Sequence, residues 1–245
     1  MSPTPTQTPT QQQPVFLRAR WCDLLLAQYA VDERVLAPLV PRGLELDPWH
    51  GKHVVSLVAF RFLRTRLKGI AIPFHTDFDE INLRFYVRRV VDGVERRGVV
   101  FIKEIVPRLA IATVARLVYD EPYVALPTRH RVEPDRVDYA WKHRGRWDRV
   151  AGSRAGEPTL VVDGTEAAFI TEHYFGSTRR RDGSTHEYQV EHPRWRTWNA
   201  SDVTIDVDAS ALYGAEFGVA LAAAPQSVFI AEGSDVVVRG GVRIA

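Results

Sequence analysis

The clearest pattern in the chain is the alternation of polar and apolar residues over two neighbouring segments, 80–91 and 96–106. Both segments are rich in β-branched and aromatic residues, which is typical of strands. They flank Asp92-Gly93, a dipeptide that suits the two-residue turn of a tight hairpin because both residue types tolerate positive φ angles. The pattern therefore predicts an antiparallel hairpin over 80–106.

The same signals predict further strands along the chain, separated by a few short helices. A helix is expected over 32–40, where Asp32 can cap it and Pro41 ends it. The other expected elements are strands over 51–62 and 137–150, hairpins at Asp182-Gly183 and over 227–244, and short helices over 109–119, 164–174 and 208–222. Many hairpins with few helices indicate a mainly β (α+β) fold, a closed or nearly closed β-barrel.

The first strand of the predicted hairpin has one polar and one apolar face, because side chains alternate along a strand. The polar face carries Glu80, Asn82, Arg84 and Tyr86. The register that follows from the turn pairs Val91 with Val94, Arg84 with Phe101, Asn82 with Lys103 and Glu80 with Ile105. Lys103 then lies across from Asn82 and within diagonal reach of Glu80 and Arg84. We therefore expect four polar groups to converge.

Two interpretations of this polar face stay open. A mixed polar strand face is most often solvated and crossed by a salt bridge. The apolar neighbours of Lys103 on its strand favour instead an enclosed site, with Glu80 and Lys103 as the candidate catalytic residues. Desolvation and Arg84 would lower the pKa of Lys103 and Glu80 would raise it, so its protonation state is open. The sequence does not decide which face of the hairpin is interior.

The composition narrows the class of protein. At 245 residues without a long linker, the chain is expected to form one domain over 15–245, behind a disordered Pro/Thr/Gln-rich tail over 1–14. The net charge of +2 is too small for nucleic-acid binding. No apolar run is long enough to span a membrane, and the N-terminus lacks the features of a signal peptide. We expect neither nucleic-acid nor membrane partners, and a homo-oligomer is left open.

The cysteine count, the histidine spacing and the motifs restrict the chemistry that the chain can perform. Cys22 is the only cysteine, so no disulfide can form within the chain, which favours the cytoplasm. The eight histidines show no metal-binding helix spacing, and we expect no metal and no cofactor. No Gly-x-Ser-x-Gly pentapeptide or Gly-rich phosphate loop is present. His173 ends a predicted helix, where a histidine often serves as a C-terminal cation; a place at a pocket rim is the alternative.

Five segments between Trp21 and Tyr188 resemble the YqjF-like family of conserved proteins. They are LLLAQYAVD, LVPRGLELD, DFDEINLRFYV, PYVALPTRH and FITEHYFG. That family is similar in turn to the acetoacetate decarboxylase superfamily, whose fold is a large, distorted antiparallel β-barrel or cone with a central cavity. The resemblance therefore implies this fold, in agreement with the hairpin-rich pattern.

The resemblance also implies a cavity carboxylate without the usual nucleophile. The cavity glutamate of acetoacetate decarboxylases falls on Glu80. The segment AIATVARLVYDEPYV resembles the stretch in which those enzymes carry an arginine and two lysines, the first forming a Schiff base. Arg116 falls on the arginine, Tyr123 on the nucleophilic lysine and Val124 on its partner. The resemblance thus favours the fold and argues against the decarboxylase reaction, and Lys103 could substitute only in a rearranged cavity.

Two functions from different classes stay open. The first is a cavity protein that binds or transforms a small carboxylate-bearing metabolite, with Arg84 or Arg116 holding the anion and Glu80 as acid or base. Asn82 and Tyr123 would line that cavity. The second is a non-catalytic small-molecule binding or assembly protein. An enzyme should keep a titratable group in a perturbed environment inside the cavity, whereas a binding module needs only shape and a counter-charge.

Overall fold

The computed structural model describes residues 12–108 and 120–245 of the chain. Two expectations from the sequence lie outside these residues: most of the N-terminal tail, and the helix over 109–119 together with Arg116. Residues 12–14, the last of the expected tail, contact the sheet, where the Pro14 carbonyl accepts a hydrogen bond from the Gly240 amide at 2.8 Å.

Strands make up most of the described chain and form one sheet of 14 strands. β4 (Phe78–Val91) and β5 (Val94–Val106) are the predicted hairpin. The other strands are β1 (Val15–Ala30), β2 (Glu45–Leu46), β3 (Val54–Leu67), β6 (Tyr123–Ala125), β7 (Thr128–Val132), β8 (Arg136–His143), β9 (Arg146–Leu160), β10 (Phe175–Arg179), β11 (Thr185–Glu191), β12 (Arg196–Asp206), β13 (Ser227–Arg239) and β14 (Val242–Arg243).

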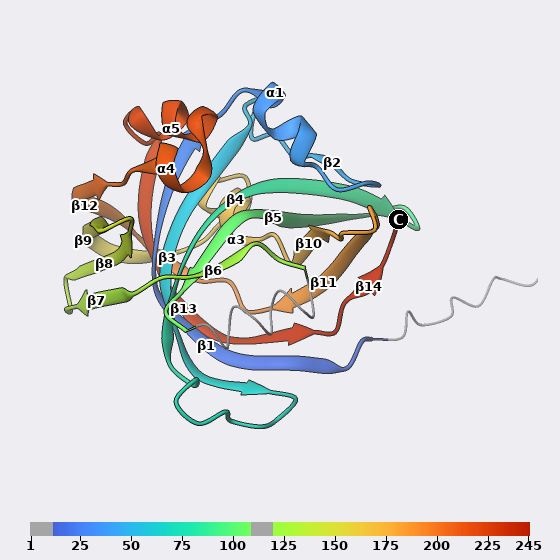
Figure 1. Cartoon of the computed structure of the whole chain (residues 1–245), viewed down its shortest axis with the longest axis horizontal. Helices are drawn as coiled ribbons and strands as arrows, with labels where there is room; N and C mark the ends of the chain where they lie inside the picture. Colours follow the sequence, from blue (N-terminus) through green and yellow to red (C-terminus); the bar gives the residue numbers. More distant parts are fainter. Residues whose placement is uncertain (1–11, 109–119) are drawn as a thin grey trace, which may run out of the picture.

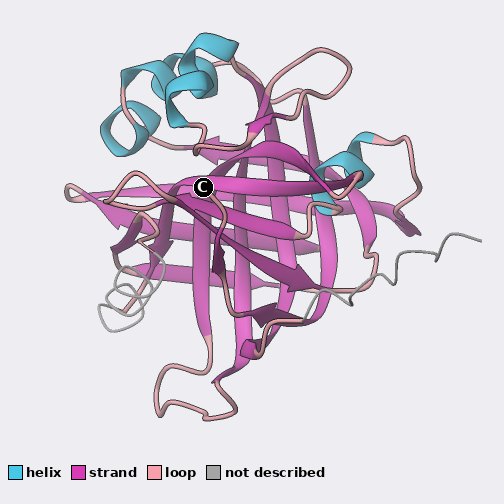
Figure 2. Cartoon of the chain, turned by 90° about the vertical axis from the view of Figure 1, so that its right-hand side faces the viewer, coloured by secondary structure: helices cyan, strands magenta, loops and turns pink. Residues whose placement is uncertain are grey.

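The sheet curves round until it meets itself. Hydrogen-bonded neighbours follow the order β13, β1, β3, β4, β5, β10 and β11, and β11 pairs again with β13 through Val190 and Val238. β12, β9, β8 and β7 extend the sheet beyond β13. Figures 1 and 2 show the long central strands bending together. The mainly β class predicted from the sequence is confirmed, in the form of one large sheet that curves in a ring.

The described helices are short. They are α1 (Glu33–Leu36), the 3-10 helix η1 (Ala37–Leu39), α3 (Glu166–Thr171), α4 (Ala209–Tyr213) and α5 (Ala215–Ala222). Asp32 caps α1 as predicted, accepting from the Arg34 amide at 2.9 Å. α4 and α5 lie next to each other in Figure 1, and their Leu212 and Phe217 join the same core cluster as Leu57 of β3.

Two features of the central strands differ from what the sequence predicted. Residues 24–29 of β1 are all buried, on both faces of the strand. Such a run lacks the period of two by which a strand is recognised, so β1 was not predicted. The closing hairpin expected over 227–244 is also wrong, because β13 runs on through Gly233 and pairs with β1 along most of its length. The turn-like residues at 233–235 mark an irregularity, not a reversal.

The two Asp-Gly pairs lie in hairpin turns, as predicted. Asp92 and Gly93 have φ angles of 52° and 78°, which suit a two-residue turn, and Val91 pairs with Val94. The hairpin of β10 and β11 closes at the pair Arg179–Thr185, so its loop over 180–184 is longer than two residues. The local turn chemistry was therefore sufficient to locate both hairpins.

A β-bulge changes the register of the β4–β5 hairpin. Arg84 pairs with Phe101 as predicted, but the next pair is Leu83–Lys103, so Ile102 is an extra residue in β5. Beyond this point Asn82 lies opposite Glu104, and the predicted pair Asn82–Lys103 is wrong. Glu80 accordingly does not pair with Ile105, whose partner is Ile81. A shift of one residue moves each side chain of β5 to the other face.

We predict that Gly233→Ala destabilises the protein much more than Gly93→Ala. Both glycines have positive φ angles, 75° and 78°, and alanine at such a position costs about 1–2 kcal/mol. A Cβ at Gly233 would also lie 2.1 Å from the Trp21 carbonyl oxygen, whereas one at Gly93 would meet nothing within 4 Å. Overpacking raises the expected loss at Gly233 to about 3 kcal/mol. Urea unfolding measures both, and equal losses would contradict the β1–β13 geometry.

Candidate functional site

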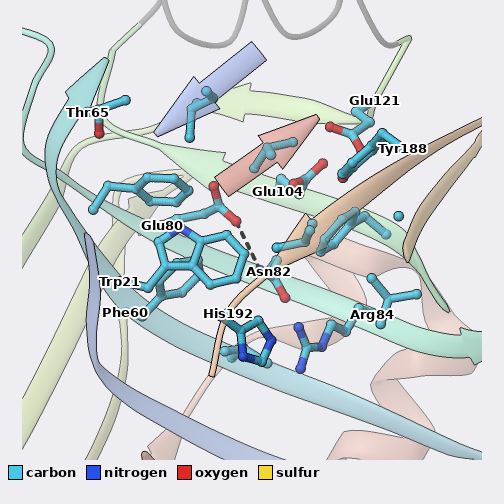
Figure 3. A pocket seen from close by; sticks show the side chains of 18 of the residues that line it. Trp21, Phe60, Thr65, Glu80, Asn82, Arg84, Glu104, Glu121, Tyr188 and His192 are labelled. Carbon is cyan, nitrogen blue, oxygen red and sulfur yellow. Dashed lines mark hydrogen bonds between the residues drawn. The ribbon is translucent and has the colours of Figure 1, made fainter. Parts of the chain in front are cut away.

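A pocket of about 340 Å³ lies inside the ring of strands. Every strand of the ring contributes at least one lining residue, and so do the last residue of α3, Thr171, and the segment after it, through His173. Much of the wall is apolar and aromatic, including Trp21, Phe60, Phe62, Phe78, Phe101, Phe175 and Trp195. Figure 3 shows Trp21 and Phe60 beside a group of polar side chains. The pocket therefore suits a small, partly apolar molecule with polar groups.

β4 supplies a row of three polar side chains to this pocket. Glu80, Asn82 and Arg84 all line it, as the alternation along the strand requires. Glu80 and Asn82 are only 3% and 2% exposed, so the polar face is not a solvated one. Asn82 donates from Nδ2 to Glu80 Oε1 at 3.0 Å, a contact drawn in Figure 3. The question left open by the sequence is thereby answered: this face of the hairpin is interior.

Glu104 takes the place that was expected for Lys103. It is 1% exposed, lines the pocket and lies opposite Asn82 because of the bulge at Ile102. Lys103 points to the other side of the sheet, where its Nζ donates to the Leu212 carbonyl of α4. It is absent from the pocket wall. The expected convergence of Lys103 with Glu80, Asn82 and Arg84 is therefore wrong, and a second buried carboxyl group stands there instead.

Tyr123 and Glu121 come from the short segment that pairs with the end of β5. β6 runs parallel to β5 with Tyr123 opposite Glu104, and the Tyr123 hydroxyl donates to Glu80 Oε2 at 3.2 Å. Glu121 is 5% exposed and accepts from the Tyr188 hydroxyl of β11 at 2.6 Å. Both residues line the pocket. Tyr123, placed at the site by resemblance, thus lies in the same pocket as Glu80.

The three buried carboxyl groups hold protons more tightly than carboxyl groups in water. Burial raises the pKa of Glu80 to about 7, opposed by hydrogen bonds from Asn82 and Tyr123. Burial raises the pKa of Glu121 to about 7 as well, opposed by its bond from Tyr188. The pKa of Glu104 is raised well above the usual range, first by burial and then by the charges of Glu121 and Glu80. Near neutral pH, this cluster holds both protonated and ionised carboxyl groups.

Two buried hydrogen-bond acceptors in the pocket have no partner among the described residues. They are Glu104 Oε2 and Asn82 Oδ1, on residues that face each other across the β4–β5 pair. A buried acceptor without a donor costs free energy. Such atoms mark the places where a bound molecule could donate hydrogen bonds.

Arg84 supplies positive charge at some distance from the carboxyl groups. One of its terminal nitrogens donates to the Ile170 carbonyl at 3.2 Å, while its Nε has no partner among the described residues. Figure 3 shows the Arg84 guanidinium beside His192, separated from Glu104 and Glu121 by Asn82. In the described chain it is the one lysine or arginine that lines the pocket. The pocket is thus polarised, with a cation at one end and carboxyl groups at the other.

His173 is a pocket residue that the sequence favoured as a helix-end cation. Its Nε2 lies 3.0 Å from Asp47 Oδ2, and Arg97 donates to the same oxygen at 2.7 Å. Burial lowers the pKa of His173 to about 4, so the ring is neutral at pH 7. Its Nδ1 has no partner within the described chain. The alternative given by the sequence, a place in the pocket wall, is the one observed.

Of the residues that line the site, sequence reasoning missed Glu104, Glu121 and Tyr188. Glu104 was assigned to the opposite face because an ideal hairpin register contains no bulge. Glu121 was treated only as part of the turn-like Asp-Glu-Pro segment, although it lies two residues before Tyr123, which the resemblance had placed at the site. Tyr188 lies on a different hairpin, and no local signal connects it with β4.

Two classes of feature are not found in the described residues. In 12–108 and 120–245, no three His, Cys, Asp or Glu side chains are grouped so that they could hold a metal ion. Within the same residues, no helix has the length and apolar character needed to cross a membrane.

Solved structures with the same fold include acetoacetate decarboxylase, an acetoacetate decarboxylase-like enzyme and an enduracididine biosynthesis enzyme. Acetoacetate decarboxylase from Legionella pneumophila aligns with a TM-score of 0.67 at 14% identity, over 100% of this chain and 92% of that one. An acetoacetate decarboxylase-like enzyme from Sphingomonas wittichii RW1 aligns at 0.62 and 14%, over 100% of both chains. The enduracididine biosynthesis enzyme MppR, complexed with pyruvate, aligns at 0.66 and 15%, over 99% and 95%. At these identities the likeness shows the fold alone.

The sequence comparisons define the family. Residues 18–235 match the DUF2071 family, described as an uncharacterized conserved protein. The protein YqjF of Bacillus subtilis is 29% identical over 192 residues, which are 76% of each chain. This chain therefore belongs to the DUF2071 family. The resemblance to YqjF-like proteins, which the sequence segments suggested, is confirmed, and the resemblance to acetoacetate decarboxylases is confirmed at the level of the fold.

We predict that Glu80→Gln changes the pH dependence of stability. A carboxyl group whose pKa is higher in the folded protein favours folding below its unfolded pKa of about 4.5 and loses this contribution as pH rises towards 7. Glutamine cannot ionise, so the stability of the variant relative to the wild type should rise between pH 4.5 and 7.5, by at most about 3 kcal/mol. Urea unfolding across this range measures the slope. A flat difference would mean that Glu80 has an ordinary pKa.

Proposed function

We propose that the protein binds and transforms a small organic acid in this pocket without forming a covalent bond to it. In this proposal the carboxylate of the ligand binds Arg84, the apolar walls surround its carbon skeleton, and Glu80 acts as a proton donor or acceptor. The observation that carries the proposal is the polarised pocket: Arg84 has an unpartnered buried Nε at one end, and protonatable carboxyl groups lie at the other.

The charge on Arg84 supports its role as the anion anchor. Guanidinium binds a carboxylate through two parallel hydrogen bonds, and such charge-assisted bonds are stronger than neutral ones. Arg84 has donors available, because within the described part of the chain its side chain makes one hydrogen bond, to the Ile170 carbonyl, and its Nε makes none. The Tyr86 ring lies 5.8 Å from the guanidinium carbon and limits its movement.

The raised pKa of Glu80 supports its role in proton transfer. A general acid or base is most effective when its pKa lies near the working pH, and burial raises the pKa of Glu80 to about 7. Tyr123 and Asn82 both donate to this carboxyl group and so hold its orientation. In an enzyme that acts on a carbonyl or hydroxyl group of an organic acid, Glu80 would be the acid or base, at the opposite end of the pocket from the carboxylate anchor Arg84. If ligands bind but no product forms, the non-catalytic binding function applies instead.

We predict that Arg84→Gln weakens the binding of short carboxylic acids such as hexanoate and benzoate about tenfold or more. This corresponds to the loss of one charge-assisted contact. Arg88→Gln is the matched control, since Arg88 lies on the same strand but pairs with Glu45 outside the pocket. Titration calorimetry gives the dissociation constants, and thermal unfolding checks that each variant is folded. Unchanged acid binding in Arg84→Gln would rule out Arg84 as the anchor.

We also predict that pyruvate or acetoacetate with borohydride leaves no covalent adduct on the protein. A Schiff base needs a neutral lysine amine near the substrate carbonyl. The four lysines of the chain are Lys52, Lys68, Lys103 and Lys142, and none of them lines the pocket. Intact mass spectrometry would detect an adduct. A stoichiometric adduct that disappears in Lys103→Arg would overturn the non-covalent proposal.

A further inference from the structure

The end of the pocket opposite Arg84 contains more acceptors than the donors of residues 12–108 and 120–245 satisfy. Glu80, Glu104 and Glu121 all line this end and are 5% exposed or less. The described donors around them are neutral: Asn82 and Tyr123 donate to Glu80, and Tyr188 donates to Glu121. Glu104 Oε2 and Asn82 Oδ1 remain without a donor from the described residues. Among the described residues, this end of the pocket therefore has fewer donors than acceptors and no lysine or arginine.

The described cation of the pocket acts on the carboxyl end only weakly. Arg84 is four residues from Glu80 along β4, which corresponds to about 13 Å between Cα atoms at the rise of an extended strand. Its charge lowers the pKa of Glu80 by less than burial raises it, and its described hydrogen bond goes to the Ile170 carbonyl and not to a carboxyl group. Figure 3 likewise shows Asn82 between Arg84 and Glu104. A buried carboxyl group without a cation is stabilised by keeping its proton, at the expense of ionisation.

We propose that this carboxyl end is a binding site for a protonated primary amine, so that the pocket takes ligands that carry both an amine and a carboxylate. An ammonium group has three donors and one positive charge, and it can therefore meet the unpartnered acceptors of Glu104 and Asn82 together. The carboxylate half of this ligand rests on the function proposed above for Arg84. The separation of the two ends favours an amine several bonds away from the carboxylate over an α-amino acid.

The proposal predicts the sign of the pH dependence. The described titratable and charged groups that line the pocket are Glu80 and Arg84 of β4, Glu104 of β5, Glu121, Tyr123 of β6, His173, Tyr188 of β11, His192, and His75 of the loop between β3 and β4. Burial lowers the pKa of His173 and His192, both tyrosines have pKa values raised well above 10 by burial, and the His75 ring contacts the Pro73 carbonyl of its own loop. The groups of the carboxyl end itself that titrate between pH 6 and 8 are therefore glutamates. An ammonium binds their ionised form, so its affinity should rise with pH.

The experiment compares 6-aminohexanoate, hexanoate and hexylamine, which share a carbon chain and differ in their charged ends. Calorimetric titrations are made at pH 6 and pH 8 on the wild type, on Glu104→Gln and on Glu95→Gln. Glu95 lies on the same strand as Glu104 but outside the pocket, and its side chain is 46% exposed. Thermal unfolding confirms that each variant is folded, and Glu121→Gln replaces Glu104→Gln if the latter is not.

At pH 8 we expect 6-aminohexanoate to bind the wild type at least about tenfold more tightly than hexanoate. For one carboxyl group with a pKa of about 7, this advantage should shrink about tenfold at pH 6. It should be lost in Glu104→Gln and kept in Glu95→Gln. Equal affinities of the two acids, an advantage that grows as pH falls, or an advantage that survives in Glu104→Gln would overturn the amine site.

Failure of the amine site and failure of the proposed function are distinguishable. Binding of hexanoate that depends on Arg84, with no gain from the amine, refutes only the amine site. Binding of hexylamine that depends on Glu104, with no binding of either acid through Arg84, refutes the organic-acid function and supports the amine site. Absence of binding by all three compounds refutes both.

Discussion

The chemistry of the pocket depends on one irregularity in backbone pairing, the extra residue Ile102 in β5. With an ideal register, Lys103 would face Asn82 and the pocket would contain a lysine beside Glu80. With the bulge, Glu104 takes that position, and Lys103 is directed towards α4. One residue more or less in a strand exchanges its two faces. A single local feature of the backbone therefore decides whether this pocket holds an amine or a second carboxyl group.

The surrounding fold can hold such unfavourable groups because it is well packed on both faces of the sheet. Burying carboxyl groups costs stability, and strain at functional sites persists only where the rest of the structure offsets it. Here one large apolar cluster, with fully buried Leu25, Leu57 and Leu83, packs on one side of the central strands. A second cluster, around Leu26 and Phe60, packs on the pocket side. The closure of β11 on β13 fixes the remaining wall.

The sequence predicted those parts of the structure that depend on neighbouring residues. The turn at Asp92-Gly93, the alternation along β4 and the cap at Asp32 are local, and all were confirmed. The bulge was not predicted, because the turn at Asp92-Gly93 sets the register from the closed end of the hairpin and gives no signal for an extra residue at Ile102. β1 was not predicted, because a strand that is buried on both faces lacks the alternation of polar and apolar residues. Of the site, the sequence pattern predicted the residues of β4. Glu121 and Tyr188 could not be predicted in this way, because contacts between segments distant in the sequence bring them to the site.

The spacing of charged groups along β4 explains why Arg84 and Glu80 do not neutralise each other. If Arg84 lay beside Glu80, the two would form a buried ion pair, with the carboxylate ionised and the guanidinium occupied. Asn82 instead separates them on the same strand face and donates to Glu80. Each end of the pocket therefore keeps a group that no described residue satisfies, a donor at Arg84 and acceptors at Glu104 and Asn82. The related fold supplies the frame for such a pocket, but the chemistry follows from these side chains and their separation.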